Sequence, residues 1–494
     1  MNIPQVLYTV SNIVLMLAGI LFVPLGVAFY YEDDAAIWAF IYTIIVTGIL
    51  GGLSKMFVRK KTADIGIREG LAIVTFSWVL CIFLGAFPFW YSGVCATYCD
   101  AVFETTSGFT TTGSSIFKDV EILPHSILFW RAFTAWLGGM GIIVIFVALL
   151  PAMGISGYQL FSAEVSGPTA DRLKPRIGET AKLLWIIYLV ITVSLILALF
   201  CGGMPIFDAI CHALSTVSTA GFSTKNTSIG YYNSLSLDVI VAVFMFICAC
   251  NFSIYYLCFQ KKFNKVLKNS ELRFFAGLVL AAIVFIALSL YFSKPASFHG
   301  GVKNACYSDL GSSFRHAFFQ VITASSTTGH VTADFDLWPE ACRFLLVLLT
   351  FIGACGGSTG GAIKCVRIVV LLKSIRRELT RIIMPRMVKH VKINGESVSE
   401  EIIADSSVFF TVYLGIFAVC SLALMALNTD IVTAFSAVAT CLANCGPGLA
   451  KVGPMANFSE ISYAGKWILS FCMLLGRLEI YSLALLFLPI MWKR

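Results

Sequence analysis

Four short stretches of this 494-residue sequence combine residue types that suit the binding of a dehydrated cation. They read "TTSGFTTTGSS" at 105–115, "STVSTAGFST" at 215–224, "ITASSTTGHVT" at 322–332 and "TCLANCGPGLA" at 440–450. In each, small hydroxyl, amide or thiol side chains lead into a glycine. Glycine reaches backbone angles closed to other residues and adds no side chain, so the carbonyl oxygens of such a loop can replace water around an ion.

The four glycines are regularly spaced. Gly113, Gly221, Gly329 and Gly446 lie 108, 108 and 117 residues apart, which indicates an internal fourfold repeat. In the fourth stretch, Gly448 is an alternative to Gly446. The residues predicted to form a selectivity filter and to bind K⁺ are Thr111, Thr112, Gly113, Thr219, Ala220, Gly221, Thr327, Thr328, Gly329, Asn444, Cys445 and Gly446.

The chemistry of these stretches favours a monovalent ion. None of the four contains Asp or Glu, the residues that bind Ca²⁺ and Mg²⁺. We therefore expect K⁺, or K⁺ with Na⁺, as the bound and transported ion, with no other cofactor. The first two stretches contain a Gly-Phe pair, whereas the third has Gly329-His330 and the fourth Gly446-Pro447. This asymmetry predicts looser K⁺ over Na⁺ selection than four identical loops would give. His330 is interpreted as a packed polar residue.

The elements that position these loops are membrane-spanning helices. With 58% hydrophobic and 13% charged residues, the chain has too little polar surface for a soluble protein of this size. Apolar runs long enough to cross a bilayer recur throughout, which predicts an all-α polytopic membrane protein with ten transmembrane helices. The predicted spans are about 6–30, 35–54, 70–92, 124–150, 181–202, 234–259, 272–292, 341–372, 406–427 and 464–490.

Each motif follows a half-hydrophobic stretch too short to cross the membrane, between two spans of a pair. Such stretches are typical of re-entrant pore helices, because non-helical backbone at membrane depth must be buried in protein or line water. The prediction is two N-terminal helices followed by four pseudo-symmetric units of span, pore helix and span. The expected divisions are 1–69 for the N-terminal helices and 70–166, 167–260, 261–392 and 393–494 for repeats 1 to 4.

The basic residues indicate orientation. Of the 35 Lys and Arg residues, 25 fall in five stretches that the predicted spans place on one side: 53–68, 167–182, 260–273, 364–392 and the C-terminus. The positive-inside rule then predicts that both termini are cytoplasmic. We interpret the net charge of +8 as this topology signal rather than as nucleic-acid binding. The basic stretch 373–401 could contact anionic membrane lipid or a regulatory subunit.

A glycine-rich segment interrupts the span predicted at 341–372. In "FIGACGGSTGGAIKCVR" at 351–367, five of the nine residues from Gly353 to Gly361 are glycine. Each costs a helix interior about 1 kcal/mol, which favours an irregular segment that could obstruct the ion path. Close helix packing through small residues is the alternative. A phosphate-binding loop is excluded because Ala362 stands where its lysine must be. The predicted gate residues are Gly353, Gly356, Gly357, Ser358, Thr359, Gly360, Gly361, Lys364 and Arg477.

Two basic residues complete the predicted gate. Arg477 lies in an apolar span, where an arginine faces a pore or a partner. We expect it under the filter and near the glycine-rich segment, as an electrostatic barrier or latch; a structural ion pair is the alternative. Glu479 is a poor partner because residues two apart point away from each other on a helix. Lys364 could bind a carboxylate or extend to the membrane interface.

The filters, "WLGGMGI" at 136–142, "CNFSIYY" at 250–256 and "LLGRLEIYS" at 474–482 together resemble the Trk/Ktr/HKT superfamily of potassium transporters. The two additional N-terminal spans and "NCGPG" at 444–448 resemble its TrkH/TrkG branch. The resemblance implies a single-chain pseudo-tetrameric pore with a gating loop, a homodimer and a cytoplasmic nucleotide-binding partner called TrkA.

These observations predict a channel-like, gated pore for potassium uptake across a bacterial inner membrane. The alternative is a proton- or sodium-coupled symporter, which usually has ionisable residues at the midplane and inverted repeats. An enzyme is not expected, because the sequence shows neither a nucleophile with its base nor a metal motif such as HExxH.

Overall fold

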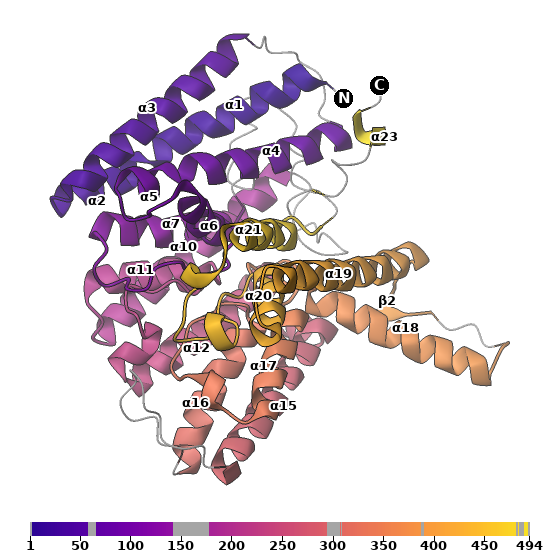
Figure 1. The fold of residues 1–494 in the computed structure, drawn as a ribbon. Helices are drawn as coiled ribbons and strands as arrows, with labels where there is room; N and C mark the ends of the chain where they lie inside the picture. Colours follow the sequence, from indigo (N-terminus) through magenta and orange to yellow (C-terminus); the bar gives the residue numbers. More distant parts are fainter. Residues whose placement is uncertain are drawn as a thin grey trace.

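The part of the chain that the structure describes is predominantly helical. The computed structural model describes residues 2–57, 66–141, 177–293, 307, 309–386, 390–480, 483 and 489–492. Within them, the strands β1 (Lys392–Ile393) and β2 (Glu396–Ser397) form one antiparallel hairpin. Figure 1 shows α1, α3 and α4 side by side at one end of the molecule, while α18 and α19 project from its flank. The basic stretches 53–68 and 167–182 fall partly outside the described residues.

Six helical segments of the described chain are long and apolar enough to cross a membrane. Two of the segments each join two consecutive helices, and the other four are long single helices. They are α1 (Ile3–Ile20) with α2 (Phe22–Tyr30), α3 (Asp34–Phe57), α4 (Ile67–Gly85) with α5 (Phe87–Tyr91), α10 (Ile177–Cys201), α15 (Ser270–Ser293) and α19 (Glu400–Ala426).

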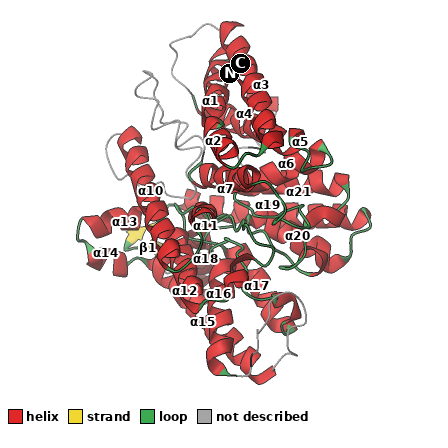
Figure 2. Ribbon diagram, turned by 90° about the vertical axis from the view of Figure 1, so that its left-hand side faces the viewer, coloured by secondary structure: helices red, strands yellow, loops and turns green. Residues whose placement is uncertain are grey.

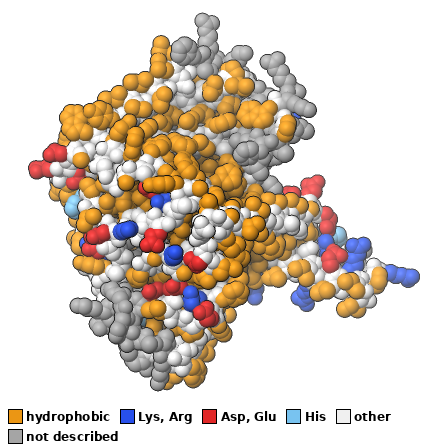
Figure 3. All heavy atoms as spheres, viewed as in Figure 1, with side chains coloured by type: hydrophobic (Ala, Val, Ile, Leu, Met, Phe, Trp, Pro, Cys, Tyr) orange, Lys and Arg blue, Asp and Glu red, His pale blue; other side chains and the backbone are white. Residues whose placement is uncertain are grey.

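The outward faces of these helices are apolar. Trp38 and Ile49 on α3 and Leu280 on α15 are each more than half exposed. Figure 3 shows hydrophobic side chains spread over the body and along the projecting arm formed by α18 and α19. Lys and Arg side chains lie on the outer part of this arm, and others lie with Asp and Glu across the middle of the body. Large apolar side chains exposed over whole helices suit contact with lipid rather than water.

Four shorter helices do not cross the molecule. They are α6 (Tyr98–Phe109), α11 (Ile206–Val217), α16 (Leu310–Ser325) and α20 (Ile431–Ala443). With 12 to 16 residues, they measure about 18 to 24 Å, short of the roughly 30 Å hydrocarbon core. Thr97, Asp309 and Asp430 cap three of their N-termini by accepting a backbone N–H of the first turn. The N–H of Thr433 lowers the pKa of Asp430.

Four other helices end sooner than the sequence predicts. They are α7 (His125–Gly139), α12 (Leu235–Ala249), α17 (Glu340–Ile352) and α21 (Tyr463–Arg477), with 13 to 15 residues each. The span predicted at 234–259 is bent between α12 and the helix that follows it, and the span predicted at 341–372 is interrupted where the sequence predicts an irregular segment. The remainders of the predictions at 124–150 and 464–490 lie largely outside the described residues.

The breaks have local causes. After α12, Cys250 and Asn251 are extended, and Asn251 caps α13 (Phe252–Phe259), which turns through 94° from α12. After α17 the chain is irregular until α18 (Cys365–Ile383) begins. The remaining elements are α14 (Phe263–Leu267), α23 (Pro489–Trp492), η2 (Ser228–Tyr232), η3 (Phe335–Leu337), η4 (Ala450–Val452) and η5 (Phe458–Glu460).

The apolar core forms two large clusters. One is built mainly from α1 to α7 with α19 to α21, and the other mainly from α10 to α17. Figure 2 shows α11 and α18 to α20 near the centre, with α12, α15 and α16 together on one side of them. The four short helices come from both clusters, two from each. Their C-terminal ends can therefore meet where the clusters adjoin.

Glycines permit the closest of these helix contacts. A Cβ atom at Gly138 of α7 would overlap the carbonyl oxygen of Phe109, at the end of α6. A Cβ atom at Gly476 of α21 would overlap the carbonyl oxygen of Leu442, near the end of α20. The helices thus rest directly on the backbone that leads into the loops.

We expect Gly138→Ala to lower the melting temperature of the purified protein in detergent, because α7 must move away from α6 to admit a methyl group. The control is Gly52→Ala on α3, where a Cβ atom meets nothing within 4 Å. Alanine in that helix interior should leave the protein as stable or more stable by about 0.5 to 1 kcal/mol. Equal melting of the two variants would contradict the packing argument.

Candidate ion-binding site

The four short helices end with the same backbone turn. One or two residues after each helix end, the chain has a left-handed residue, with φ between +54° and +59° at Thr111, Thr219, Thr327 and Asn444. The N–H of the following residue donates a hydrogen bond to the carbonyl five residues earlier, at 2.8 to 2.9 Å. The donor and acceptor residues are Thr112 and Ser107, Ala220 and Ser215, Thr328 and Thr323, and Cys445 and Thr440. This is the Schellman arrangement of a helix C-terminus. The four predicted filter loops therefore share one conformation.

The loops meet in a closed ring. Each ring glycine has φ between +76° and +92°. A Cβ atom placed on it would meet the carbonyl oxygen of the neighbouring loop. The pairs are Gly113 with Ala220, Gly221 with Thr328, Gly329 with Cys445, and Gly446 with Thr112. The structure thus brings the predicted loops 111–113, 219–221, 327–329 and 444–446, here called the ring loops, around one axis.

The ring distinguishes the two glycines of the fourth motif. Gly446 lies against the carbonyl of Thr112 and closes the ring. Gly448 instead donates its N–H to the carbonyl of Val452 at 2.7 Å and lies beside Ser436. Gly446 is therefore equivalent to the other three glycines.

The electrostatics of the ring favour a cation. Four helix C-termini end at the ring loops, and each carries a partial negative charge from the aligned peptide dipoles. The N–H groups of Thr112, Ala220, Thr328 and Cys445 turn back to the helices. Their carbonyl oxygens lie at the neighbouring glycines. Oxygen atoms of four loops thus surround the axis without a fixed negative charge.

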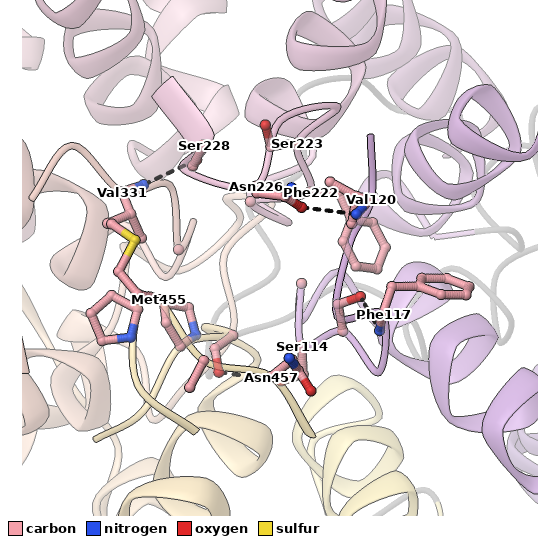
Figure 4. A pocket seen from close by; sticks show the side chains of 18 of the residues that line it. Ser114, Phe117, Val120, Phe222, Ser223, Asn226, Ser228, Val331, Met455 and Asn457 are labelled. Atoms are coloured by element: carbon pink, nitrogen blue, oxygen red, sulfur yellow. Dashed lines mark hydrogen bonds between the residues drawn. The ribbon is translucent and has the colours of Figure 1, made fainter. Parts of the chain in front are cut away.

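A cavity of about 150 Å³ opens on one side of the ring and is lined by all four ring glycines. Figure 4 shows Ser114, Phe222, Val331, Met455 and Asn457 around it, contributed by loops from all four motifs. Hydrogen bonds between neighbouring loops stabilise its wall, such as Val331 N–H to Ser228 Oγ at 3.2 Å. Water and an ion could reach the carbonyl ring from this cavity.

A buried ion pair supports the first ring loop. Arg131 Nε lies 2.7 Å from Glu104 Oε1, and the two side chains are 3% and 0% exposed. Glu104 also accepts the N–H of Ile116 at 3.0 Å, which fixes the extended chain that follows the first ring loop. Sequence reasoning missed this pair. Its one signal is a glutamate inside the half-hydrophobic stretch before the first motif.

The glycine segment, residues 353–364, lies under the ring. The N–H of Gly361 donates to Thr327 Oγ1 at 2.9 Å, and Thr359 Oγ1 donates to the carbonyl of Val217, the last residue of α11, at 3.2 Å. Phe252 N–H donates to the carbonyl of Gly357 at 3.0 Å. The irregular segment predicted from the glycines is thus present, packed between the ends of α11, α16 and α12. The alternative of a continuous, closely packed helix is wrong.

The other residues of the segment hold it in a folded loop. Gly353 and Gly357 have φ near +69°, and Gly356 donates its N–H to Glu271 Oε1 at 2.7 Å. Ser358 Oγ donates to the carbonyl of Cys355. A Cβ atom at Gly360 would lie against the carbonyl of Ser326 and against Thr327 Oγ1, beside the third ring loop.

Lys364 is buried, with 2% of its surface exposed. Its Nζ donates to the carbonyl of Gly360 in the same segment. The interpretation that it extends to the membrane interface is therefore wrong: the cation is satisfied by a carbonyl that the left-handed backbone at Lys364 brings within reach.

Arg477 lies where the sequence predicts, although it ends α21 rather than continuing it. Its guanidinium donates to the carbonyl of Thr359 at 2.8 Å and to that of Gly139 at 2.8 Å. It also donates to the carbonyl of Gly138 and lies 3.4 Å from Thr111 Oγ1. Arg477 thus joins the glycine segment, the end of α7 and the first ring loop.

Glu479, which the sequence marks as a poor partner for Arg477, forms an ion pair with a different arginine. Glu479 follows α21 and lies 2.6 Å from Arg367 of α18. The pair links the end of α21 to the helix that leaves the glycine segment. This ion pair could not be predicted from local sequence patterns, because the two residues are 112 positions apart.

Comparison with known proteins agrees with this geometry. The family model named TrkH, described as a cation transport protein, matches residues 36–493. The chain belongs to the TrkH family. It is a multi-pass membrane protein of ion transport, as the sequence resemblance predicts.

TrkH-family relatives cover nearly the whole chain. The Trk system potassium uptake protein TrkH of Salmonella typhimurium is 39% identical over 487 residues, 98% of each chain. The Trk system potassium uptake protein TrkG of Escherichia coli is 34% identical over 95% of this chain and 94% of its own. The crystal structure of the potassium transporter TrkH from Vibrio parahaemolyticus covers 100% of both chains with a TM-score of 0.87 and 34% identity.

We expect Glu104→Gln to lower the melting temperature of the purified protein strongly. The amide keeps the shape of the side chain but leaves the buried guanidinium of Arg131 without its counter-ion, which typically costs about 3 to 5 kcal/mol. The control is Glu340→Gln, whose carboxylate is 88% exposed beside Arg343. That exposed pair should contribute little. Similar melting temperatures for both variants would show that the buried pair does not hold the first ring loop.

Proposed function

We propose that this chain is a channel-like pore for potassium uptake across a bacterial inner membrane. The observation that carries the proposal is the closed ring of four loops, in which four carbonyl oxygens adjoin four glycines of equal conformation. Relatives over nearly the full chain are named potassium uptake proteins. Carbonyl oxygens without carboxylates suit an alkali ion that must bind and then leave.

In this proposal, the chain folds into ten spans, with two N-terminal helices and four pseudo-symmetric units of span, pore helix and span. Both termini face the cytoplasm, so the cavity above the ring opens outward. An ion loses water as it passes from the cavity into the carbonyl ring, and the membrane potential drives it inward. The residues that bind K⁺ are the twelve of the ring loops.

The glycine segment and Arg477 form the gate of this pore. The segment lies directly under the third ring loop through Gly361 and Thr327. Arg477 holds it through the carbonyl of Thr359 and places a positive charge on the path of a cation. The guanidinium of Arg477 binds a carbonyl of the segment and a carbonyl of α7, and so ties the segment to α7. For the pore to open, the segment must break its hydrogen bond with Arg477 and move away from the ring.

The partners of the proposal come from the family resemblance: a TrkA-like cytoplasmic nucleotide-binding subunit, a second copy of the chain, and membrane lipid. The projecting arm of α18 and α19 carries exposed basic residues, Arg376 and Arg381 among them, that suit contact with a cytoplasmic partner or anionic lipid (Figure 3). A proton- or sodium-coupled symporter is the alternative mechanism.

Bilayer recording of the purified protein tests the proposal. We expect stepwise K⁺ currents with a reversal potential that follows the K⁺ gradient. Slow flux that requires a proton or Na⁺ gradient would support the symporter instead. Gly113→Ala should abolish the current, since its methyl group would collide with the carbonyl of Ala220 in the ring.

The matched control for the ring is Gly203→Ala. Gly203 also has positive φ, at +93°, but a Cβ atom there meets nothing within 4 Å. Both substitutions carry the same backbone cost of about 1 to 2 kcal/mol, so only the ring variant should lose conduction. A wild-type K⁺ current in the Gly113→Ala variant would contradict the proposal that the carbonyl ring conducts the ion.

We expect Arg477→Ala to raise K⁺ flux several-fold, because it removes both the fixed positive charge and the hydrogen bonds that retain Thr359. Arg477→Lys keeps the positive charge but loses the planar guanidinium that binds several carbonyls at once, and it should give an intermediate flux. The measurement is K⁺ uptake in vesicles together with open probability. Unchanged uptake and conductance in the alanine variant would remove Arg477 from the gate.

A further inference from the structure

The residue after each ring glycine differs among the four loops. These positions hold Ser114, Phe222, His330 and Pro447. By sequence alone, such unlike side chains predict loose ion selection. The first three are buried and Pro447 is partly buried, and each contacts the loop or helix of a neighbouring unit. Their chemistry therefore bears on how firmly the ring loops are held.

Ser114 and Pro447 connect loops across the ring. Ser114 Oγ donates to the carbonyl of Gly446 at 3.2 Å, which joins the first loop to the fourth. The pyrrolidine Cδ of Pro447 lies 2.9 Å from the position of a Cβ atom at Gly329, which packs the fourth loop against the third. Both contacts involve backbone of the neighbouring ring glycine, so a shift of one loop is passed on to the next.

Phe222 connects the second loop to the first by another chemistry. Its ring lies 4.3 Å from the guanidinium carbon of Arg131, which is itself held by Glu104. A buried cation–π contact of this kind is stronger than an exposed one, because water does not compete for the guanidinium. Arg131 also donates to the carbonyl of Ser223 at 3.2 Å, so the second loop is held on two adjacent residues.

His330 connects the third loop to the second by two hydrogen bonds. Its imidazole is fully buried, with Nε2 at 2.9 Å from Thr216 Oγ1 of α11 and Nδ1 at 3.4 Å from Ser228 Oγ of η2. Ser228 Oγ accepts the N–H of Val331, so its own proton is available to Nδ1. A neutral imidazole that donates from Nε2 to Thr216 satisfies both ring nitrogens.

We propose that these four residues form a closed series of contacts that fixes the spacing of the carbonyl ring. Ser114 joins the first loop to the fourth, Phe222 the second to the first, His330 the third to the second, and Pro447 the fourth to the third. Within this series, His330 is the positioning residue that sets K⁺ over Na⁺ selectivity. Na⁺ is smaller, so its binding requires the carbonyls to move inward, and loops tied to their neighbours resist that movement. This inference rests on the proposed function.

The experiment measures the reversal potential in mixed K⁺ and Na⁺ solutions for the full-length protein in bilayers. His330→Ala should lower the K⁺/Na⁺ permeability ratio by about fivefold for each hydrogen bond lost, while K⁺ still permeates. Thr216→Val and Ser228→Ala each remove one partner and should give part of the change. Each should add little to His330→Ala, because the residues act through the same contacts.

The control is His316→Ala. His316 is also a buried histidine, on α16 before the third ring loop, and its ring contacts Tyr307. Its Nδ1 has no hydrogen-bond partner within the described part of the chain. Its loss should leave the permeability ratio unchanged. Partial recovery of the ratio in His330→Gln, whose amide both donates and accepts, would separate positioning from simple loss of packing.

Two results would overturn the inference. One is a wild-type permeability ratio in His330→Ala, Thr216→Val and Ser228→Ala alike. The other is an equal fall in His330→Ala and His316→Ala. Failure of the proposed function is distinguishable, because the wild-type protein would then carry no K⁺ current of its own.

Discussion

The structure depends on the contact between a carbonyl oxygen of one loop and the glycine of the next. Four such contacts close a ring, and none leaves space for a Cβ atom. The contact requires a left-handed glycine at the same place in every loop, and a helix end that turns the chain in the same direction each time. The shortness of α6, α11, α16 and α20 follows, since their C-termini must stop at the ring and direct their dipoles to it.

The helices around the ring end inside the protein, where their last backbone groups are not hydrogen-bonded within a helix. Exposed N–H and C=O groups in lipid are costly, so the broken ends of α7, α12, α17 and α21 must be satisfied inside the protein. Arg477 supplies this at α7 by donating to the carbonyls of Gly138 and Gly139. The same guanidinium binds Thr359 of the glycine segment. One side chain therefore stabilises a helix end and connects it to the proposed gate.

A single chain with four similar loops differs from an assembly of four identical subunits in one respect. Each position around the ring can carry a different side chain, although the backbone is the same. Among the residues that the structure describes, the glycine segment belongs to the third unit. The residue after each ring glycine joins its neighbour by a hydroxyl, an aromatic ring, an imidazole or a pyrrolidine. Chemical asymmetry is therefore compatible with a uniformly held ring.

Local chemistry was sufficient to determine several features from the sequence alone. Apolar runs require lipid-facing helices, repeated glycines require left-handed loops, and five glycines in nine residues break a helix, so the ring loops and the glycine segment could be predicted. Arg477 could be placed under the ring because a charge among apolar residues needs polar groups. Partners distant in the sequence could not be predicted. Glu104 with Arg131, Arg367 with Glu479, the return of Lys364 to Gly360 and the 94° turn after α12 all depend on which backbones packing brings together. Only the tertiary structure decided these, because burial fixes which donor meets which acceptor, and burial is a property of the whole fold.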